Sequence, residues 1–209
     1  MPNLDQLNQY AREMAAEYEI ATSGRVSRRK FPKLEDDNLI LIQAYKSTNE
    51  EVKSKGNIVP AAEWLLDNFY VIEEQIKEIQ QSIPRDFYKE LPILIKGKHK
   101  GYSRVYGIAM EMIAFTDGRI DEDIIVDFLK EYQKEVPLTS EELWAIPLMI
   151  RICLLQKIKD IAIYIIESLK ERKLADEWAL KLVDGLIKSK EDDHPKESLR
   201  NIITEHDAT

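Results

Sequence analysis

Apolar residues recur every three or four positions along most of the chain, which is the spacing of one face of an α-helix. This pattern predicts helices over 4–20, 35–55, 60–82, 104–115, 121–135 and 140–170, and shorter ones over 174–188 and 195–205. Pro60 suits the first position of a helix, and Asp121 suits an N-cap. The expected fold is all-α, a compact bundle of about seven to nine helices.

The most apolar helix is expected near residues 140–168, at the centre of the bundle. Its residues from Leu143 to Leu155 are apolar on nearly every side, as in a helix surrounded by others. Thr139 and Glu142 have the spacing of a capping box, in which each side chain bonds the backbone N–H of the other. The helix is therefore predicted to begin at Ser140.

Three regions are expected along the chain. Residues 1–30 form an N-terminal helix and a linker containing Arg25, Arg28, Arg29 and Lys30; residues 31–168 form a helical core domain; residues 169–209 form a C-terminal helical extension. A long loop is expected over 84–103, with a second basic cluster at Lys96, Lys98, His99 and Lys100. We interpret both clusters as solvated segments; the alternative is contact with anionic lipid headgroups or phosphates.

Composition narrows the classes of function. The 209 residues carry a formal net charge of -8, which argues against a nucleic-acid partner because phosphate binding needs a basic surface. No signal peptide and no transmembrane segment are predicted, because every apolar stretch is too short or interrupted by charge. The single Cys153 lies in an apolar helix, where a packing role is expected.

Motifs for chemistry are missing or incomplete. The three histidines lie far apart in sequence, so no metal site is predicted. Asp117, Asp121 and Asp123 resemble part of an EF-hand loop, but Arg119, Glu122 and Phe128 occupy positions that calcium binding requires for other residues. No phosphate-binding glycine loop and no nucleophile elbow occurs. We predict no cofactor and no catalytic residue in this chain.

Five segments, in order, resemble the N-terminal region of the cyclic β-1,2-glucan synthetase family. They are PAAEWLLDNFYVIEEQI (60–76), DFYKELPIL (86–94), GYSRVYGIAMEMIAFTDGRID (101–121), EYQKEVPLT (131–139) and ELWAIPLMIRICLL (142–155). The resemblance runs from about Gly24 to Ala162, and the strings WLLDNF, TDGR and ELWAIP make it specific. Members of this family are large bacterial inner-membrane enzymes with a UDP-glucose-dependent glucosyltransferase and a phosphorylase-like module.

The resemblance implies that this chain supports an enzyme whose chemistry lies elsewhere. Its expected partner is the transferase module of the same polypeptide, with β-glucan as a further candidate ligand, at the cytoplasmic face of the inner membrane. Within the resemblance, the candidate binding residues are Arg104, Tyr106, Asp117 and Arg119. An alternative for these four is that they tie helix ends together. Trp64, Asp67, Asn68 and Trp144 are interpreted as packing residues.

Three functions are compatible with these features of the sequence. The first is a non-catalytic accessory domain of a glucan-synthesising transferase. The second is a stand-alone helical interaction module, which predicts an exposed apolar patch or groove. The third is an independent carbohydrate-active enzyme.

Overall fold

The computed structural model describes residues 4–21, 30–55, 58–82 and 91–191, and this part of the chain is mainly helical. It contains six helices, so the expected count of seven to nine is wrong for the described residues. The helices are α1 (Leu4–Glu17), α2 (Leu34–Lys55), α3 (Pro60–Ser82), α5 (Arg104–Phe115), α6 (Glu122–Glu135) and α7 (Ser140–Glu191). The predicted helix over 195–205 and Arg25, Arg28 and Arg29 of the basic linker lie outside the described residues.

The lower count has a physical reason in α7. Lys170 to Leu174 was expected to separate two helices, but no glycine or proline interrupts it, and its residues are good helix formers. The result is one helix of 52 residues, which ends at Glu191, three residues beyond the predicted end of the helix over 174–188. At about 1.5 Å per residue, α7 is about 78 Å long. It passes through the expected boundary between residues 168 and 169.

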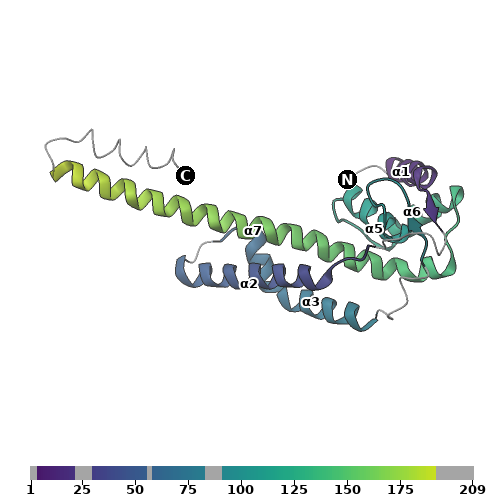
Figure 1. Cartoon of the computed structure of the whole chain (residues 1–209), viewed down its shortest axis with the longest axis horizontal. Coiled ribbons are helices and arrows are strands. Elements are labelled where there is room, and N and C mark those ends of the chain that lie inside the picture. The colour runs from purple at the N-terminus through teal and green to yellow at the C-terminus, as the bar shows by residue number, and fades with distance from the viewer. Residues whose placement is uncertain (1–3, 22–29, 56–57, 83–90, 192–209) are drawn as a thin grey trace.

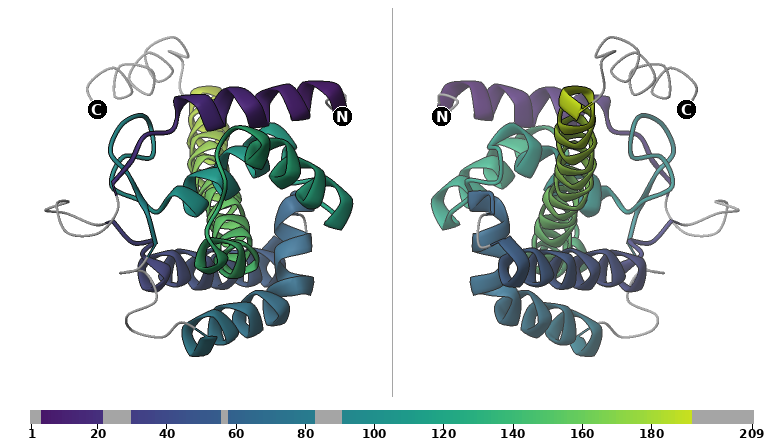
Figure 2. Two further views of the ribbon diagram at one scale, coloured as in Figure 1. Left: turned by 90° about the vertical axis from the view of Figure 1, so that its right-hand side faces the viewer. Right: turned by 90° about the vertical axis from the view of Figure 1, so that its left-hand side faces the viewer.

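Two groups of helices pack on opposite sides of the first half of α7 (Figures 1 and 2). One group contains α1, α5 and α6, with α1 against α6 and α5 against α7. The other contains α2 and α3, which contact each other and α7. The core lies between these groups and α7, whereas the C-terminal part of α7 extends beyond both (Figure 1). The expected central apolar helix is therefore confirmed in its position.

The buried faces follow the apolar periodicity. On α3, apolar residues at steps of three and four form a buried stripe: Leu65, Phe69, Ile72, Ile76 and Ile79. On α6, the largest buried side chains are Phe128 and Tyr132, which are fully inaccessible to solvent. The predicted N-cap Asp121 accepts a hydrogen bond from the backbone N–H of Ile124 at 2.9 Å. Local periodicity therefore predicts which faces form the core.

A small two-stranded sheet joins the end of the helix predicted over 4–20 to the loop predicted over 84–103. β1 (Ile20–Ala21) pairs antiparallel with β2 (Ile93–Leu94), with Ile20 opposite Leu94. Strands of two residues show no alternation along the sequence, so periodicity cannot detect them. The sheet attaches the end of the α1 segment to the loop before α5, and Leu91, Ile93 and Leu94 are buried there.

No described helix has a stretch that is both long enough and apolar enough to span a bilayer.

Candidate functional site

Arg104 opens α5 and is buried, with only 2% of its surface exposed. Ser103 caps this helix by accepting a hydrogen bond from the backbone N–H of Tyr106 at 3.3 Å. The backbone N–H of Arg104 donates to the carbonyl oxygen of Pro92 at 2.8 Å, which holds the loop against the helix start. The guanidinium therefore points into the protein from a fixed backbone position.

Glu142, in the first turn of α7, is the ionic partner of Arg104. Arg104 Nε donates to Glu142 Oε1 at 2.8 Å, its Nη2 donates to Glu142 Oε2, and Nη2 also donates to the carbonyl oxygen of Pro137 at 3.2 Å. Burial would lower the pKa of Arg104, but the hydrogen bond and charge of Glu142 raise it above its usual value. Both charges are satisfied within the protein, so this pair ties α5 to α7.

Glu142 also completes the predicted capping box. The backbone N–H of Thr139 donates to Glu142 Oε2 at 3.0 Å, and the backbone N–H of Glu142 donates to Thr139 Oγ1 at 3.3 Å. One carboxylate thus caps α7 and neutralises a buried arginine. These contacts of Arg104 join the start of α5 to the start of α7, as expected if Arg104 ties helix ends together.

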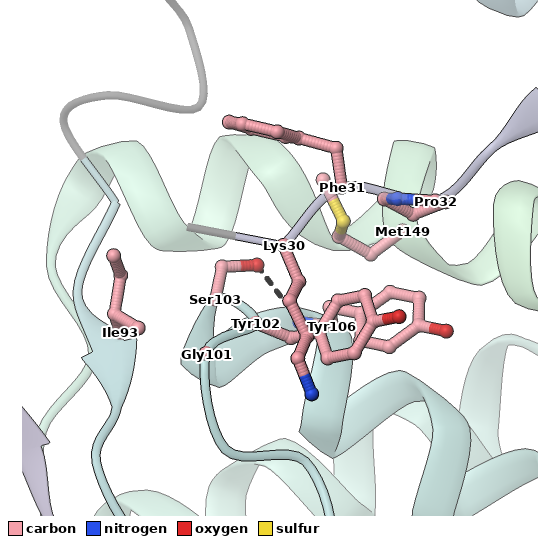
Figure 3. Close-up of a pocket in the computed structure, with 9 residues that line it drawn as sticks. All are labelled: Lys30, Phe31, Pro32, Ile93, Gly101, Tyr102, Ser103, Tyr106 and Met149. Carbon is pink, nitrogen blue, oxygen red and sulfur yellow. Dashed lines mark hydrogen bonds between the residues drawn. The ribbon is translucent and has the colours of Figure 1, made fainter. Parts of the chain in front are cut away.

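Tyr106 lies in the first turn of α5, beside the aromatic side chains of Phe31 and Tyr102 (Figure 3). Its hydroxyl donates to Gln156 Oε1 at 2.8 Å, and its ring stacks on Tyr102 with centroids 4.5 Å apart. The ammonium of Lys30 lies 5.5 Å from the centre of the Tyr102 ring. The pocket beside these rings has a volume of about 10 Å³, room for about one water molecule. It is too small for a sugar residue.

Asp117 and Arg119 lie in an exposed turn at the other end of α5. Asp117 has a φ of 51° and Gly118 a φ of 77°, so two consecutive left-handed residues make the turn. Asp117 Oδ1 lies 3.3 Å from Lys157 Nζ. Since α5 has 12 residues and is about 18 Å long, this turn is far from the start of the helix. Arg104 and Tyr106 both lie in the first turn of α5 but contact different partners, Glu142 and Gln156. The four candidates therefore do not form one cluster, and their role in binding stays a prediction.

A polar cleft lies between α1, the loop before α5 and the middle of α5. We call it the Glu111 cleft; its volume is about 450 Å³, and its lining includes Tyr10, Glu13, Glu17, Lys96, Lys98, His99 and Glu111. Sequence reasoning missed Glu111, because no local pattern links it to His99 or Tyr10. The sequence indicated this cleft only through the basic cluster at 96–100, three members of which line it.

In that cleft, the Glu111 carboxylate contacts three polar side chains. Its carboxylate accepts hydrogen bonds from Tyr10 Oη at 2.5 Å and Lys98 Nζ at 3.0 Å, and lies 2.6 Å from His99 Nε2. Burial would raise the pKa of Glu111, but the hydrogen bonds from Tyr10, His99 and Lys98 lower it to about 2. Lys96 is similarly paired with Glu19 at 2.6 Å. Of the basic cluster, three members thus contact carboxylates of the same chain.

An apolar groove runs between α3 and α7. We call it the α3–α7 groove; its volume is about 270 Å³, and its lining residues are Trp64, Asn68, Val71, Ile72, Gln75, Arg151, Leu154, Leu155 and Ile158. The prediction that Trp144 is a packing residue is wrong, because its side chain is 83% exposed, and Trp64 is 51% exposed. Helical periodicity cannot distinguish a buried stripe from an exposed apolar one.

Within the described residues, no group of three or more metal-binding side chains comes together. Cys153 is buried, and burial raises the pKa of its thiol, as a packing role predicts. Its Sγ lies 3.9 Å from the carbonyl oxygen of Tyr106.

Comparison with known proteins gives one informative relationship. No protein-family model matches the chain. The chain is 34% identical over 144 residues to the cyclic beta-(1,2)-glucan synthase NdvB of Rhizobium meliloti (strain 1021). Those residues make up 68% of this chain but only 5% of that protein. This chain is therefore related to the cyclic β-(1,2)-glucan synthase family.

Proposed function

We propose that this chain is a non-catalytic accessory domain that supports glucosyl transfer from UDP-glucose within a larger glucan synthase polypeptide. The proposal rests on the difference between two coverages: the match includes most of this chain but little of the related synthase. Identity of 34% extends over two thirds of this chain and yet accounts for 5% of the related synthase. Such a segment is a small part of a large enzyme, and most of the large enzyme lies outside it.

The distribution of charge and apolar surface supports an accessory role. The buried Arg104–Glu142 pair and three of the basic loop residues are engaged by partners inside this chain. In contrast, aromatic and aliphatic side chains are exposed on α3 and α7, including Trp64, Val71 and Trp144. Exposed apolar patches of this kind mark surfaces that contact another protein or another domain. We propose that the partner is the transferase module of the same polypeptide, on the cytoplasmic face of the inner membrane.

The test uses a cyclic β-(1,2)-glucan synthase from which the matching segment has been removed. Membranes containing this shortened enzyme are supplied with radiolabelled UDP-glucose, with and without the purified chain. The proposal predicts that removal lowers incorporation into β-1,2-glucan and that the added chain restores part of it. Full activity of the shortened enzyme contradicts the proposal.

The competing function, an independent carbohydrate-active enzyme, needs only the purified chain. We expect no product when it is incubated with UDP-glucose or with β-1,2-glucan. Turnover by the chain alone would replace the accessory role with a catalytic one.

A further inference from the structure

The α3–α7 groove has the form of a seat for a third helix. Glu78, near the end of α3, lies 3.4 Å from Arg151, near the start of α7, so the two helices run in opposite directions along the groove (Figure 1). On α3 the groove extends from Trp64 to Gln75, a rise of about 16 Å. Three turns of an additional helix would fill that length.

Each polar side chain of the groove donates at least one hydrogen bond within the chain. Asn68 Nδ2 donates to the carbonyl oxygen of Trp64 at 2.8 Å, and Gln75 Nε2 donates to Glu78 at 3.2 Å. Arg151 donates to the same Glu78 carboxylate at 3.4 Å. A sugar chain needs several donors and acceptors along its length, whereas this groove offers only three polar side chains, each partly engaged within the chain. The remaining lining is apolar, which favours the apolar face of a helix over a glucan.

The apolar surface continues along α7 beyond the groove. Trp144, Arg151 and Ile158 follow one another at seven-residue steps, so they share one side of this helix. Trp144 is 83% exposed and extends the same side toward the start of α7. A partner helix longer than three turns would therefore meet an aromatic side chain at that end.

Acidic side chains along one edge of the groove indicate the charge that a partner should carry. Glu63, Asp67, Glu74 and Glu78 are all exposed on α3. Their helical spacing puts them in one row, beside the row of Trp64, Asn68, Val71 and Gln75 that lines the groove. Lys77 lies beside this row, and Glu78 is bonded to Arg151, so Glu63, Asp67 and Glu74 are the acidic residues that a partner helix would meet. A helix seated in the groove would be attracted if its flank toward α3 carried lysines or arginines.

We infer that the α3–α7 groove binds a basic amphipathic helix of three to four turns, contributed by another part of the synthase polypeptide. The source of that helix rests on the proposed function. Its apolar face covers Val71, Leu154 and Ile158, and its basic flank lies along the acidic row of α3. This is the helix-in-groove mode of recognition, with anchors spaced at three, four and seven residues.

The experiment measures fluorescence anisotropy of synthetic helical peptides titrated with the purified chain. The probe has about 18 residues, because shorter helices are marginal in water. It carries leucines at the anchor positions and lysines on one flank; a second peptide replaces those lysines with glutamates. We expect the lysine peptide to bind about tenfold more tightly than the glutamate peptide. Equal affinities, or no binding of either, overturn the inference.

Two matched substitutions locate the binding. Val71 in the groove and Val126 on α6 are both 39% exposed, so Val71→Gln and Val126→Gln remove similar apolar surface. Val71→Gln should weaken the lysine peptide at least about fivefold, and Val126→Gln should leave it unchanged. Glu74→Lys should weaken the lysine peptide and strengthen the glutamate peptide. Equal effects of the two valine substitutions contradict the groove as the site.

Two other occupants give distinct results. If β-1,2-glucan oligosaccharides compete with the peptide, or if sedimentation shows a dimer that Val71→Gln dissociates, the basic helix is not the occupant. Both assays use the isolated chain, so a negative peptide result overturns this inference alone. Restoration of the shortened synthase still decides the proposed function separately.

Discussion

Arg104 and Glu142 form a buried ion pair that joins the first turn of α5 to the first turn of α7. The arginine side chain is 3% exposed and the glutamate side chain is fully buried. The same carboxylate accepts the backbone N–H of Thr139, so helix capping and charge neutralisation depend on one residue. The two helices on which most of the core is built are thereby fixed relative to each other.

Glu142→Gln should therefore destabilise the fold. The substitution leaves a buried guanidinium without its counter-charge, and breaking a buried pair costs about 3–5 kcal/mol. Urea denaturation followed by circular dichroism measures the loss. Glu141→Gln is the control, since Glu141 is exposed in the same turn, and it should change the free energy of unfolding little. Equal effects at both positions would contradict the assignment.

Tyr106→Phe tests whether the Tyr106 hydroxyl acts within the fold. The change removes the 2.8 Å hydrogen bond to Gln156 and should lower the free energy of unfolding by about 1 kcal/mol. Tyr164→Phe, at a side chain 64% exposed, should have no effect and serves as the comparison. If Tyr106→Phe leaves the stability of the chain unchanged but weakens synthase restoration, a ligand role replaces the structural one.

Gly107→Ala should destabilise although alanine is the better helix former. A Cβ at this position would lie 2.8 Å from Leu94 Cδ1 and 3.1 Å from Tyr18 Oη, so the Leu94 side chain, which is 1% exposed in the core, must shift and the Tyr18 side chain must give way. Forcing atoms into a packed core costs about 1–3 kcal/mol, which exceeds the roughly 1 kcal/mol gained from helix propensity. Adding Leu94→Val should recover part of the loss. A thermal melt in which Gly107→Ala is more stable than the wild type refutes this close packing.

Acid should weaken the fold through Glu111. Its pKa is about 2 in the folded chain against an ordinary value of 4.5, so its stabilising contribution is complete above pH 4.5. That contribution declines as the pH falls from 4.5 through 2, because protonation removes the charge that Lys98 and His99 contact. Melting temperatures of wild type and Glu111→Gln should differ at neutral pH and converge toward pH 2. A constant difference over that range would exclude this role.

The sequence predicted those helix bounds and caps that depend on residues close together in the chain. The bounds of α3 and α5, the Asp121 cap and the Thr139–Glu142 capping box all follow from residues within a few positions of each other. The strands β1 and β2 could not be predicted in this way, because their pairing joins Ile20 to Leu94 across the sequence.

The candidate site shows the same division. Burial of Cys153 follows from its apolar neighbours, whereas the partner of Arg104 lies 38 positions away and no pattern marks it. The hydrogen bond from Tyr10 to Glu111 spans 101 positions. Trp144 lies in an apolar stretch that predicts burial, yet no described element covers it. Long-range pairing and uncovered surface both depend on tertiary arrangement.

We propose that this domain acts by binding the catalytic remainder of a synthase. The most direct measurement is the affinity of the purified chain for a cyclic β-(1,2)-glucan synthase that lacks the matching 144 residues, immobilised in nanodiscs and followed by surface plasmon resonance. We expect a saturable one-to-one complex that Val71→Gln weakens and Val126→Gln does not. Absence of saturable binding, with both proteins folded, would contradict it.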